Sequence, residues 1–159
     1  MPEAFVGVGS NTDPARAVRA AVAALEQRFG TLRCSSIYRS PAVGVPAAAY
    51  LNLVVALPTD VDPATLRQAL DVIEAAAGRR RDDPAVCRLD LDLLLYGCAV
   101  DAERRLPRAG VFVQPFVLGP LAEIAPGLVH PLTGQRCADA WRAAPPTRLE
   151  NVGTVASLG

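Results

Sequence analysis

The apolar positions of the chain follow two different periods, and these periods predict the order of its secondary structure. Four short apolar runs, bounded by glycine, proline or polar clusters, have the composition of β-strands. Two longer segments repeat apolar residues every three or four positions, which is typical of amphipathic helices. The expected strands cover residues 4–9, 31–38, 50–57 and 89–96, and the expected helices cover residues 14–29 and 63–77.

Both helices are expected to begin in the same way. Asp13-Pro14 and Asp62-Pro63 each place an N-capping aspartate before a proline of the first helical turn. The order strand, helix, strand, strand, helix, strand predicts a ferredoxin-like βαββαβ sandwich. This α+β fold has an antiparallel sheet with helices on one face and leaves the other face free for a ligand.

The pattern is less regular beyond residue 97. We expect a short strand or hairpin over 100–106, a short helix over 116–124 and another helix around 138–142, as a C-terminal extension. The tail from about residue 147 is expected to be loose. No repeat or linker divides the chain, so we predict a single domain over residues 1–159.

Composition and charge narrow the classes of partner. Of the 159 residues, 51% are apolar, and 16 basic side chains balance 16 acidic ones. A polyanion binder is usually basic, so nucleic acid is disfavoured as a partner. No apolar run reaches the length of a membrane span, and no signal-peptide pattern is visible. The four scattered cysteines form no C-x-x-C pair, which favours free thiols in a reducing compartment. We therefore expect a cytoplasmic monomer that binds neither nucleic acid nor membrane.

The fourth expected strand carries two carboxylates. Asp90 and Asp92 share one face of the strand because successive side chains alternate, while Leu91, Leu93 and Leu95 point the other way into a core. Two adjacent carboxylates repel each other, and a cation between them removes that cost. Mg²⁺ is commonly held by one or two carboxylates together with substrate phosphates. The pattern therefore indicates a magnesium site.

Arginines surround this strand in the sequence. Arg79-Arg80-Arg81 lie upstream of it, and Arg88 stands directly before it. Guanidinium groups in this position would suit an anionic ligand. The alternative is an ordinary strand end with two solvated aspartates beside a charged loop.

Three other positions are candidates for binding. Tyr50 and Asn52 share one strand face and would suit a planar heterocycle, although a wet sheet face is the commoner case. Glu74 lies near a helix C-terminus, where the macrodipole disfavours a carboxylate, so it requires a partner, either an arginine or a ligand group. The turn at 9–11 either presents backbone N–H groups to a ligand or is a plain turn, and we favour the plain turn.

Taken in order, the motifs resemble a known family, the 6-hydroxymethyl-7,8-dihydropterin pyrophosphokinases of folate biosynthesis. These enzymes move a diphosphate group from ATP to a pterin alcohol. The resemblance covers nearly the whole chain up to about His130. The motifs that carry it are Gly9-Ser10-Asn11, Ser36-Ile37-Tyr38-Arg39-Ser40-Pro41, Tyr50-Leu51-Asn52, Ile73-Glu74, Gly78-Arg79, Leu89-Asp90-Leu91-Asp92, Tyr96-Gly97, Phe116-Val117-Leu118, Pro120-Leu121 and Glu123-Ile124-Ala125-Pro126.

The resemblance implies a role for each candidate residue. Asp90 and Asp92 would hold two Mg²⁺ ions that bridge the phosphates of ATP, the co-substrate. The pterin pocket would be lined by Ser40, Pro41, Val43, Tyr50, Asn52 and Phe116. The catalytic residues would be Arg79, Arg81, Arg88, Asp90 and Asp92. The nucleotide would be contacted by Glu74, Arg81, Arg88, Leu93 and Arg108.

Two loops depart from the family pattern. The loop before the aspartate strand reads Pro84-Ala85-Val86-Cys87-Arg88, about two residues short and without the family's tryptophan. A later loop has Pro107-Arg108 and Gln114 where the family has a Pro-His pair and an arginine. The only histidine, His130, lies outside that loop and is expected to pack or to face solvent.

Three readings follow from these residues. The first is an active pterin pyrophosphokinase with a remodelled phosphate loop. The second is a diverged paralogue with weak or altered activity, which acts on a related pterin or merely binds one. The third is an unrelated ferredoxin-like binder, which the 5% aromatic content and balanced charge place last. We rank the first reading ahead, because a binder without a metal has no use for two paired aspartates.

Overall fold

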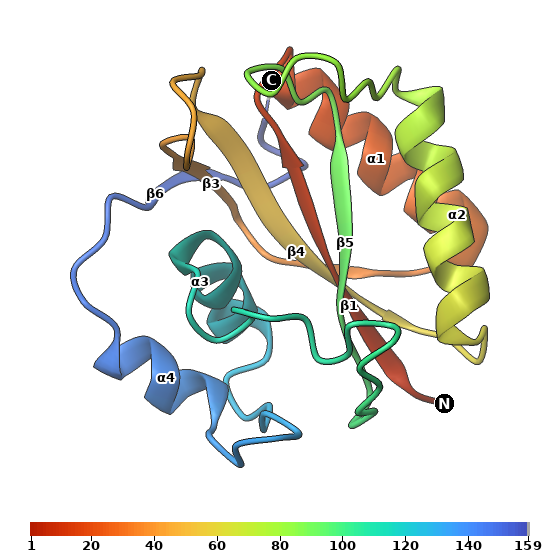
Figure 1. Cartoon of the computed structure of the whole chain (residues 1–159), viewed down its shortest axis with the longest axis vertical. Helices are drawn as coiled ribbons and strands as arrows, with labels where there is room; N and C mark the ends of the chain where they lie inside the picture. Colours follow the sequence, from red (N-terminus) through yellow and green to blue (C-terminus); the bar gives the residue numbers. More distant parts are fainter. Residues whose placement is uncertain (159) are drawn as a thin grey trace.

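A six-stranded sheet runs through the centre of the molecule (Figure 1). The computed structural model describes residues 1–158. The strands are β1 (Glu3–Ser10), β2 (Arg33–Cys34), β3 (Ile37–Ser40), β4 (Tyr50–Pro58), β5 (Asp90–Tyr96) and β6 (Glu150–Gly153). Their spatial order is β5-β1-β4-β3-β6, with β2 also paired to β4, and every pairing is antiparallel. Since β2 and β3 together form the second strand of the βαββαβ unit, the ferredoxin-like prediction is confirmed.

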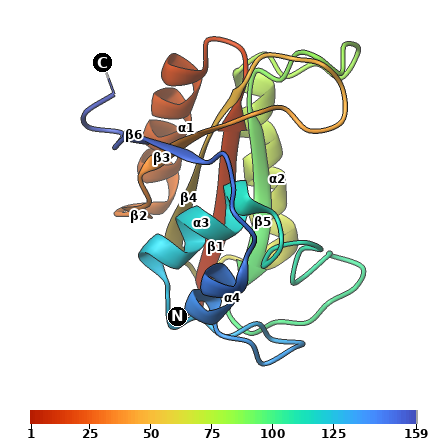
Figure 2. The ribbon, with the colours of Figure 1, turned by 90° about the vertical axis from the view of Figure 1, so that its left-hand side faces the viewer.

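Helices lie on both faces of this sheet. They are α1 (Pro14–Phe29), α2 (Pro63–Ala76), α3 (Pro115–Ile124) and α4 (Cys137–Ala143). The pair α1 and α2 covers one face, as the βαββαβ pattern predicts (Figure 1). The helices expected in the C-terminal extension are α3 and α4, and they cover only the lower part of the opposite face in Figure 2. No helix among residues 1–158 has the length and apolar character needed to cross a membrane.

The two Asp-Pro helix starts differ. Asp62 Oδ1 accepts a hydrogen bond of 3.0 Å from the amide of Thr65, so it caps α2 as predicted. Asp13 occupies the N-cap position before Pro14, as predicted, but it has a φ of 45° and its side chain makes no cap hydrogen bond. Only residues 11–13 connect β1 to α1, and the left-handed conformation of Asp13 turns the chain within that short distance.

A β-bulge interrupts the edge strand β5. Val6 of β1 pairs with Leu93, but the next pair joins Phe5 to Leu95. Leu94 is therefore an extra residue on β5, and side chains beyond it are shifted to the other face. The leucines before and after the bulge therefore pack on opposite faces of the sheet.

The expected alternation along β5 holds only before the bulge. Leu91 and Leu93 lie in the core beneath α1 and α2, as predicted, and Asp90 and Asp92 share the opposite face. Leu95 packs instead in the second core beneath α3 and α4, so its predicted placement is wrong. The bulge follows Asp92, which is why the two carboxylates keep their common face.

Residues 150–158 are attached to the sheet and its core, so the expectation of a loose tail from about residue 147 is wrong for this described part. Strand β6 pairs with the outer edge of β3, with Tyr38 opposite Asn151 and Arg39 opposite Glu150. Val152 packs against the first core. The segment is too short and too polar to show a strand pattern, and it is recruited by the free edge of β3. The hairpin expected over 100–106 is reduced to a single bridge between Asp101 and Leu106.

Candidate active site

The part of the sheet that α3 and α4 leave open forms a cavity of about 220 Å³. It lies over β1, β4 and β5, between the loop that follows β3 and the start of α3. Its lining includes all six residues expected to bind the pterin and both aspartates. These are Ser40, Pro41, Val43, Tyr50, Asn52, Phe116, Asp90 and Asp92. Residues from four separate parts of the sequence thus meet at one place.

Two glycines of β1 form the floor of this cavity. Gly9 lies opposite Asn52 on one side and Asp90 on the other, and Gly7 lies opposite Asp92. A Cβ at position 9 would stand only 2.9 Å from Asn52 Oδ1. The sequence interpretation did not assign these glycines to a site, although glycine within a strand often marks a close approach of backbone or ligand.

Asn52 is held in a fixed orientation. Its Nδ2 donates a hydrogen bond of 2.8 Å to Ser40 Oγ, and both residues are buried. This contact leaves Asn52 Oδ1 above Gly9, on the cavity side. Burial, with the thiol of Cys87 nearby, raises the pKa of Tyr50 to about 12, so its hydroxyl stays neutral and able to donate. The cavity thus offers an amide and a phenol to a polar heterocycle.

The position of Phe116 depends on how α3 is attached to the sheet. Glu123, at the other end of α3, accepts hydrogen bonds from the amide of Ser36 (3.0 Å), from Ser36 Oγ (2.9 Å) and from the hydroxyl of Tyr38. One carboxylate therefore joins α3 to β3 and to the residue before it. This contact places Phe116, in the first turn of α3, at the cavity.

The carboxylates of Asp90 and Asp92 lie next to each other on the same face of β5. Burial, and then the neighbouring Asp90 carboxylate, raise the pKa of Asp92 to about 7. Two close carboxylates on a partly dry sheet face are suited to a hard divalent cation. Among residues 1–158 no group of three or more acidic, histidine or cysteine side chains gathers to hold a metal. The pair thus fits Mg²⁺ that completes its coordination with phosphate oxygens, and does not form a closed protein cage.

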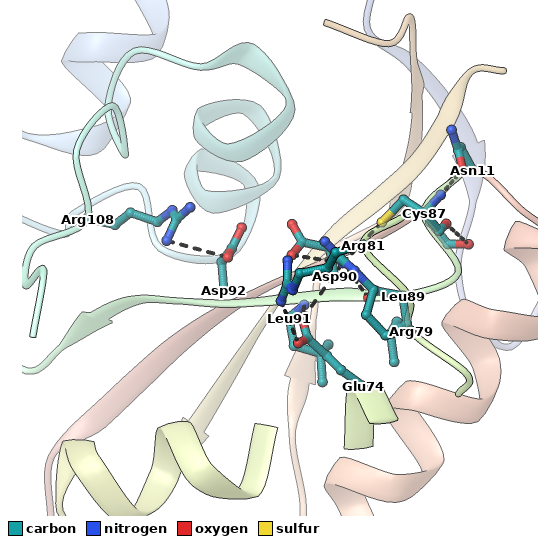
Figure 3. Close-up of polar contacts among 11 residues, drawn as sticks. Asn11, Glu74, Arg79, Arg81, Cys87, Leu89, Asp90, Leu91, Asp92 and Arg108 are labelled. Atoms are coloured by element: carbon teal, nitrogen blue, oxygen red, sulfur yellow. Dashed lines mark hydrogen bonds and ion pairs between the residues drawn. The ribbon is translucent and has the colours of Figure 1, made fainter. Parts of the chain in front are cut away.

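Glu74 lies beneath Arg79 and Arg81 of the loop that precedes β5 (Figure 3). Its Oε2 accepts a 2.7 Å hydrogen bond from the amide of Leu91, which faces the open edge of the sheet on β5. Arg79 Nη1 lies 4.0 Å from Oε2, and Arg81 Nη2 lies 3.6 Å from Oε1. Burial raises the pKa of Glu74. The carboxylate therefore fixes β5 and two arginines, and its partners on the protein already occupy both oxygens.

Arg79 and Arg81 differ in exposure. Only 17% of the Arg79 side chain is exposed, and its Nη1 donates to Leu89 O at 2.7 Å and approaches Asp90 Oδ1 at 3.3 Å. The Arg81 side chain is 71% exposed. Arg79 therefore braces the start of β5 and neutralises Asp90, whereas Arg81, although paired with Glu74 at 3.6 Å, is largely exposed and has more freedom to reach a ligand.

Arg108 supplies the positive charge at Asp92. Its Nη1 lies 3.4 Å from Asp92 Oδ1 (Figure 3). Its backbone amide donates a 2.9 Å hydrogen bond to Leu94 O. The bulged residue of β5 thus anchors the loop that carries Arg108. The structure thus places Arg108 beside the aspartate pair.

Two expected site residues lie elsewhere. The side chain of Leu93 is 1% exposed in the core beneath α1 and α2, so it does not reach a nucleotide at the cavity. Arg88 is exposed and lines a groove between α1 and α2, where it packs beside Gly78. Cys87 and Leu89 point inward on either side of Arg88, and alternation turns it outward. His130 packs edge-to-face on Phe112 with ring centroids 5.1 Å apart, as expected of a packing residue.

Comparison with known sequences places the chain in a family. The sequence profile of 7,8-dihydro-6-hydroxymethylpterin-pyrophosphokinase (HPPK) matches residues 5–126. The chain is 39% identical to a 2-amino-4-hydroxy-6-hydroxymethyldihydropteridine pyrophosphokinase of Synechocystis sp., over 92% of this chain and 83% of that protein. It is 38% identical to the protein of the same name from Methylorubrum extorquens, over 96% and 99% respectively. The chain belongs to the HPPK family, and the reading as an unrelated binder is wrong.

Solved structures share the fold. A crystal structure of an HPPK-DHPS in complex with substrates superposes with a TM-score of 0.72 at 12% identity over 89% of this chain. A Plasmodium falciparum HPPK-DHPS triple mutant gives a TM-score of 0.74 at 11% identity, also over 89%. This chain spans 44% and 43% of those longer chains. At such low identity the likeness shows the fold alone.

Proposed function

We propose that this protein transfers a diphosphate group from ATP to 6-hydroxymethyl-7,8-dihydropterin and releases AMP. The observation that carries the proposal is the continuity of one cavity. Its one side offers an aromatic ring, an amide and a phenol, and its other side is the pair Asp90 and Asp92. A site that binds a heterocycle beside a carboxylate pair suits transfer from a metal-bound polyphosphate to an alcohol.

The pterin half is built from Phe116, Asn52 and Tyr50. The ring of Phe116 would stack on the flat heterocycle, because aromatic faces prefer offset stacking. Asn52 would hydrogen-bond the edge of the heterocycle through the oxygen that Ser40 leaves free. Gly9 and Gly7 let the heterocycle approach the sheet closely.

The phosphate half is built from the two aspartates and two arginines. Asp90 and Asp92 would hold Mg²⁺, which when bound would neutralise triphosphate charge and complete its coordination with phosphate oxygens. Arg108 and Arg81 are exposed enough to reach the same phosphates. Guanidinium groups bind phosphate oxygens in pairs and hold them in a fixed direction.

The reaction then needs little covalent chemistry from the protein. The pterin hydroxyl oxygen bonds to the β-phosphorus, the bond from that phosphorus to the α,β-bridging oxygen breaks, and AMP leaves. The hydroxyl proton is lost in the same process. Phosphoryl-type transfer is accelerated mainly by positioning and by stabilising the charge on the transferred group. Asn52 and Phe116 would orient the alcohol, and Arg108 would stabilise the charge.

Arg108 belongs to the loop in which this chain lacks the histidine and the arginine of the family pattern. It stands where the resemblance implies a histidine, and it is already directed at Asp92. We propose that it supplies part of the positive charge that the family takes from the histidine and arginine of this loop. Nothing in residues 1–158 favours a binding protein without turnover over an enzyme.

The test is AMP release from ATP and Mg²⁺ with and without 6-hydroxymethyl-7,8-dihydropterin. Asp90→Ala/Asp92→Ala serves as the blank, and Asp60→Ala/Asp71→Ala, which removes two exposed carboxylates elsewhere, serves as the matched control. We expect pterin-dependent AMP at least about 100-fold above the blank, with the control unchanged. A wild-type signal equal to the blank would contradict the proposal, and pterin binding without turnover would then identify a binding protein.

A further inference from the structure

We infer that Asn11 is a positioning residue. It fixes the loop of residues 77–89 before β5, and it thereby holds Arg79 and Asp90 in the relative positions that catalysis requires. Asn11 belongs to the turn after β1, which from sequence alone is an ordinary turn. In the structure its side chain is buried, and it contacts a loop more than 70 residues away in the sequence. The inference rests on the proposed function only for its kinetic consequences.

The contact is a three-point clamp. Asn11 Oδ1 accepts a 2.7 Å hydrogen bond from the amide of Cys87, and Asn11 Nδ2 donates a 2.8 Å hydrogen bond to Ala85 O. The backbone amide of Asn11 donates a 2.9 Å hydrogen bond to Cys87 O. Ser10 Oγ reaches the same carbonyl at 3.3 Å. Asn11 thus pairs with the loop as a neighbouring strand would, by means of its side-chain amide (Figure 3).

The clamped loop leads directly to the site. The thiol of Cys87 lies 3.2 Å from Arg79 Nη1, and the same guanidinium nitrogen reaches Leu89 O at 2.7 Å and Asp90 Oδ1 at 3.3 Å. Fixing Cys87 therefore fixes one partner of Arg79 and, three residues on, the start of β5 at Asp90. Arg79 Nε is buried without a hydrogen-bond partner, so the position of this side chain depends on the contacts of Nη1 with Cys87, Leu89, Asp90 and Glu74.

Between Asp82 and Val86 the loop makes few hydrogen bonds besides those with Asn11. Residues 77–89 contain no helix or strand, and most of them are exposed. Within residues 82–86 the other hydrogen bonds belong to a local turn, in which Asp83 accepts from the amides of Ala85 and Val86. A segment of this kind samples many conformations unless long-range contacts select one. Asn11 provides that selection at Ala85 and Cys87.

The requirement is specific to asparagine. Both ends of the amide are used, one as acceptor and one as donor. Aspartate would keep the acceptor for Cys87 but would place a second oxygen against Ala85 O. Alanine would lose both contacts. Thr12, whose Oγ1 donates to Asn11 Oδ1 at 3.0 Å without touching the loop, provides a matched control.

The first readout is amide hydrogen exchange of the ligand-free full-length protein, which needs no activity. In the wild type we expect the amide of Cys87 to exchange at least about tenfold more slowly than those of the exposed Asp82 and Asp83, because it is hydrogen-bonded and buried. Asn11→Ala should remove this protection, Asn11→Asp should weaken it, and Thr12→Val should leave it unchanged. Equal exchange at Cys87 and Asp82 in the wild type would overturn the inference, even if Asn11→Ala failed to fold.

The second readout separates positioning from a loss of folding. Asn11→Ala should lower kcat by about tenfold and raise the KM for ATP, while the dissociation constant for the pterin changes less than about twofold. Equal losses of affinity for ATP and for the pterin would overturn the positioning role. Unchanged kinetics in a variant whose Cys87 amide has lost its exchange protection would also overturn it. If the wild type shows the protected Cys87 amide but forms no AMP, the proposed function fails while the clamp remains.

Discussion

Arg108 Nη1 stands 3.4 Å from Asp92 Oδ1, while Arg79 Nη1 stands 3.3 Å from Asp90 Oδ1. Each carboxylate of the pair thus has its own arginine, and the two arginines come from different loops. The two differ in freedom, because Arg79 is braced on Leu89 O whereas Arg108 has 33% of its side chain exposed. We therefore propose Arg108 as the member of this group that would turn toward a phosphate if a cation took its place at Asp92.

The first prediction concerns this arginine. Arg108→Ala should lower kcat/KM for ATP by about 100-fold, since one donor aimed at a developing charge has an effect of that order. Arg108→Lys should recover part of the loss, because it keeps the charge without the paired geometry. Arg104→Ala, which removes an exposed arginine paired to Asp101, is the control. Steady-state kinetics that are unchanged in Arg108→Ala would exclude the residue from the phosphate site.

The second prediction follows from the raised pKa of Asp92. A carboxyl pKa raised to about 7 in the folded state means that the native protein holds this proton more tightly than the unfolded chain. Its contribution to the free energy of unfolding is full below about pH 4 and is lost as the pH rises toward 7. Asp92→Asn should therefore be more stable than the wild type at pH 8, by about 1 kcal/mol or more, and nearly equal to it at low pH.

Urea denaturation with EDTA at pH 5 and pH 8 measures this difference. Asp101→Asn is the control, because Arg104 lowers the pKa of the Asp101 carboxyl and no gain is expected there. Parallel stability curves for the wild type and Asp92→Asn between pH 5 and 8 would contradict the raised pKa.

The third prediction concerns the floor of the cavity. Gly9→Ala would place a methyl group 2.9 Å from Asn52 Oδ1 and force that side chain away from the cavity. We expect pterin affinity to fall at least tenfold, with ATP affinity much less affected, because a displaced anchor loses its hydrogen bond to the ligand. Gly7→Ala is the matched comparison, since its methyl group would meet Leu94 at an ordinary 3.6 Å and should have a smaller effect. Calorimetric titration with each ligand would decide, and equal losses for pterin and ATP would exclude the assignment.

The fourth prediction tests how α3 is held. Glu123→Ala removes the acceptor shared by Ser36 and Tyr38 and should lower the free energy of unfolding by about 1–3 kcal/mol, as expected for hydrogen bonds to a charged group. Pterin affinity should fall with it, because Phe116 is carried by the same helix. Glu103→Ala, on an exposed turn, is the control. If Glu123→Ala is less stable but binds pterin normally, the helix anchor is separate from the pocket.

The periodicity of apolar residues was sufficient to predict the ferredoxin-like unit, because its strands and helices each have a clear apolar face. The bulge at Leu94 was not predictable, since an extra leucine between Leu93 and Leu95 leaves the run uniformly apolar. Strand β6 was missed for a related reason: it is a short polar segment that gains its structure from the edge of β3.

The candidate site was only partly readable from the residues. Alternation alone placed Asp90 and Asp92 on one face, but the gathering of the six pocket residues came from the family resemblance. Closeness in sequence did not predict which arginine lies at the site. Arg88, just before β5, turns away from the cavity. Arg108, which follows β5, is brought back to the site by the hydrogen bond of its amide to Leu94 O. Such placements depend on long-range contacts, which the local pattern does not contain.

We propose that the cavity and the two aspartates are halves of one site. The most direct measurement is a crystal structure with Mn²⁺, α,β-methylene-ATP and 6-hydroxymethylpterin, in which anomalous scattering locates the metal. We expect metal peaks within coordination distance of Asp90 and Asp92, with the pterin ring on Phe116 and its hydroxymethyl group directed at the β-phosphorus. Metal bound away from both aspartates, or a pterin outside this cavity, would contradict it.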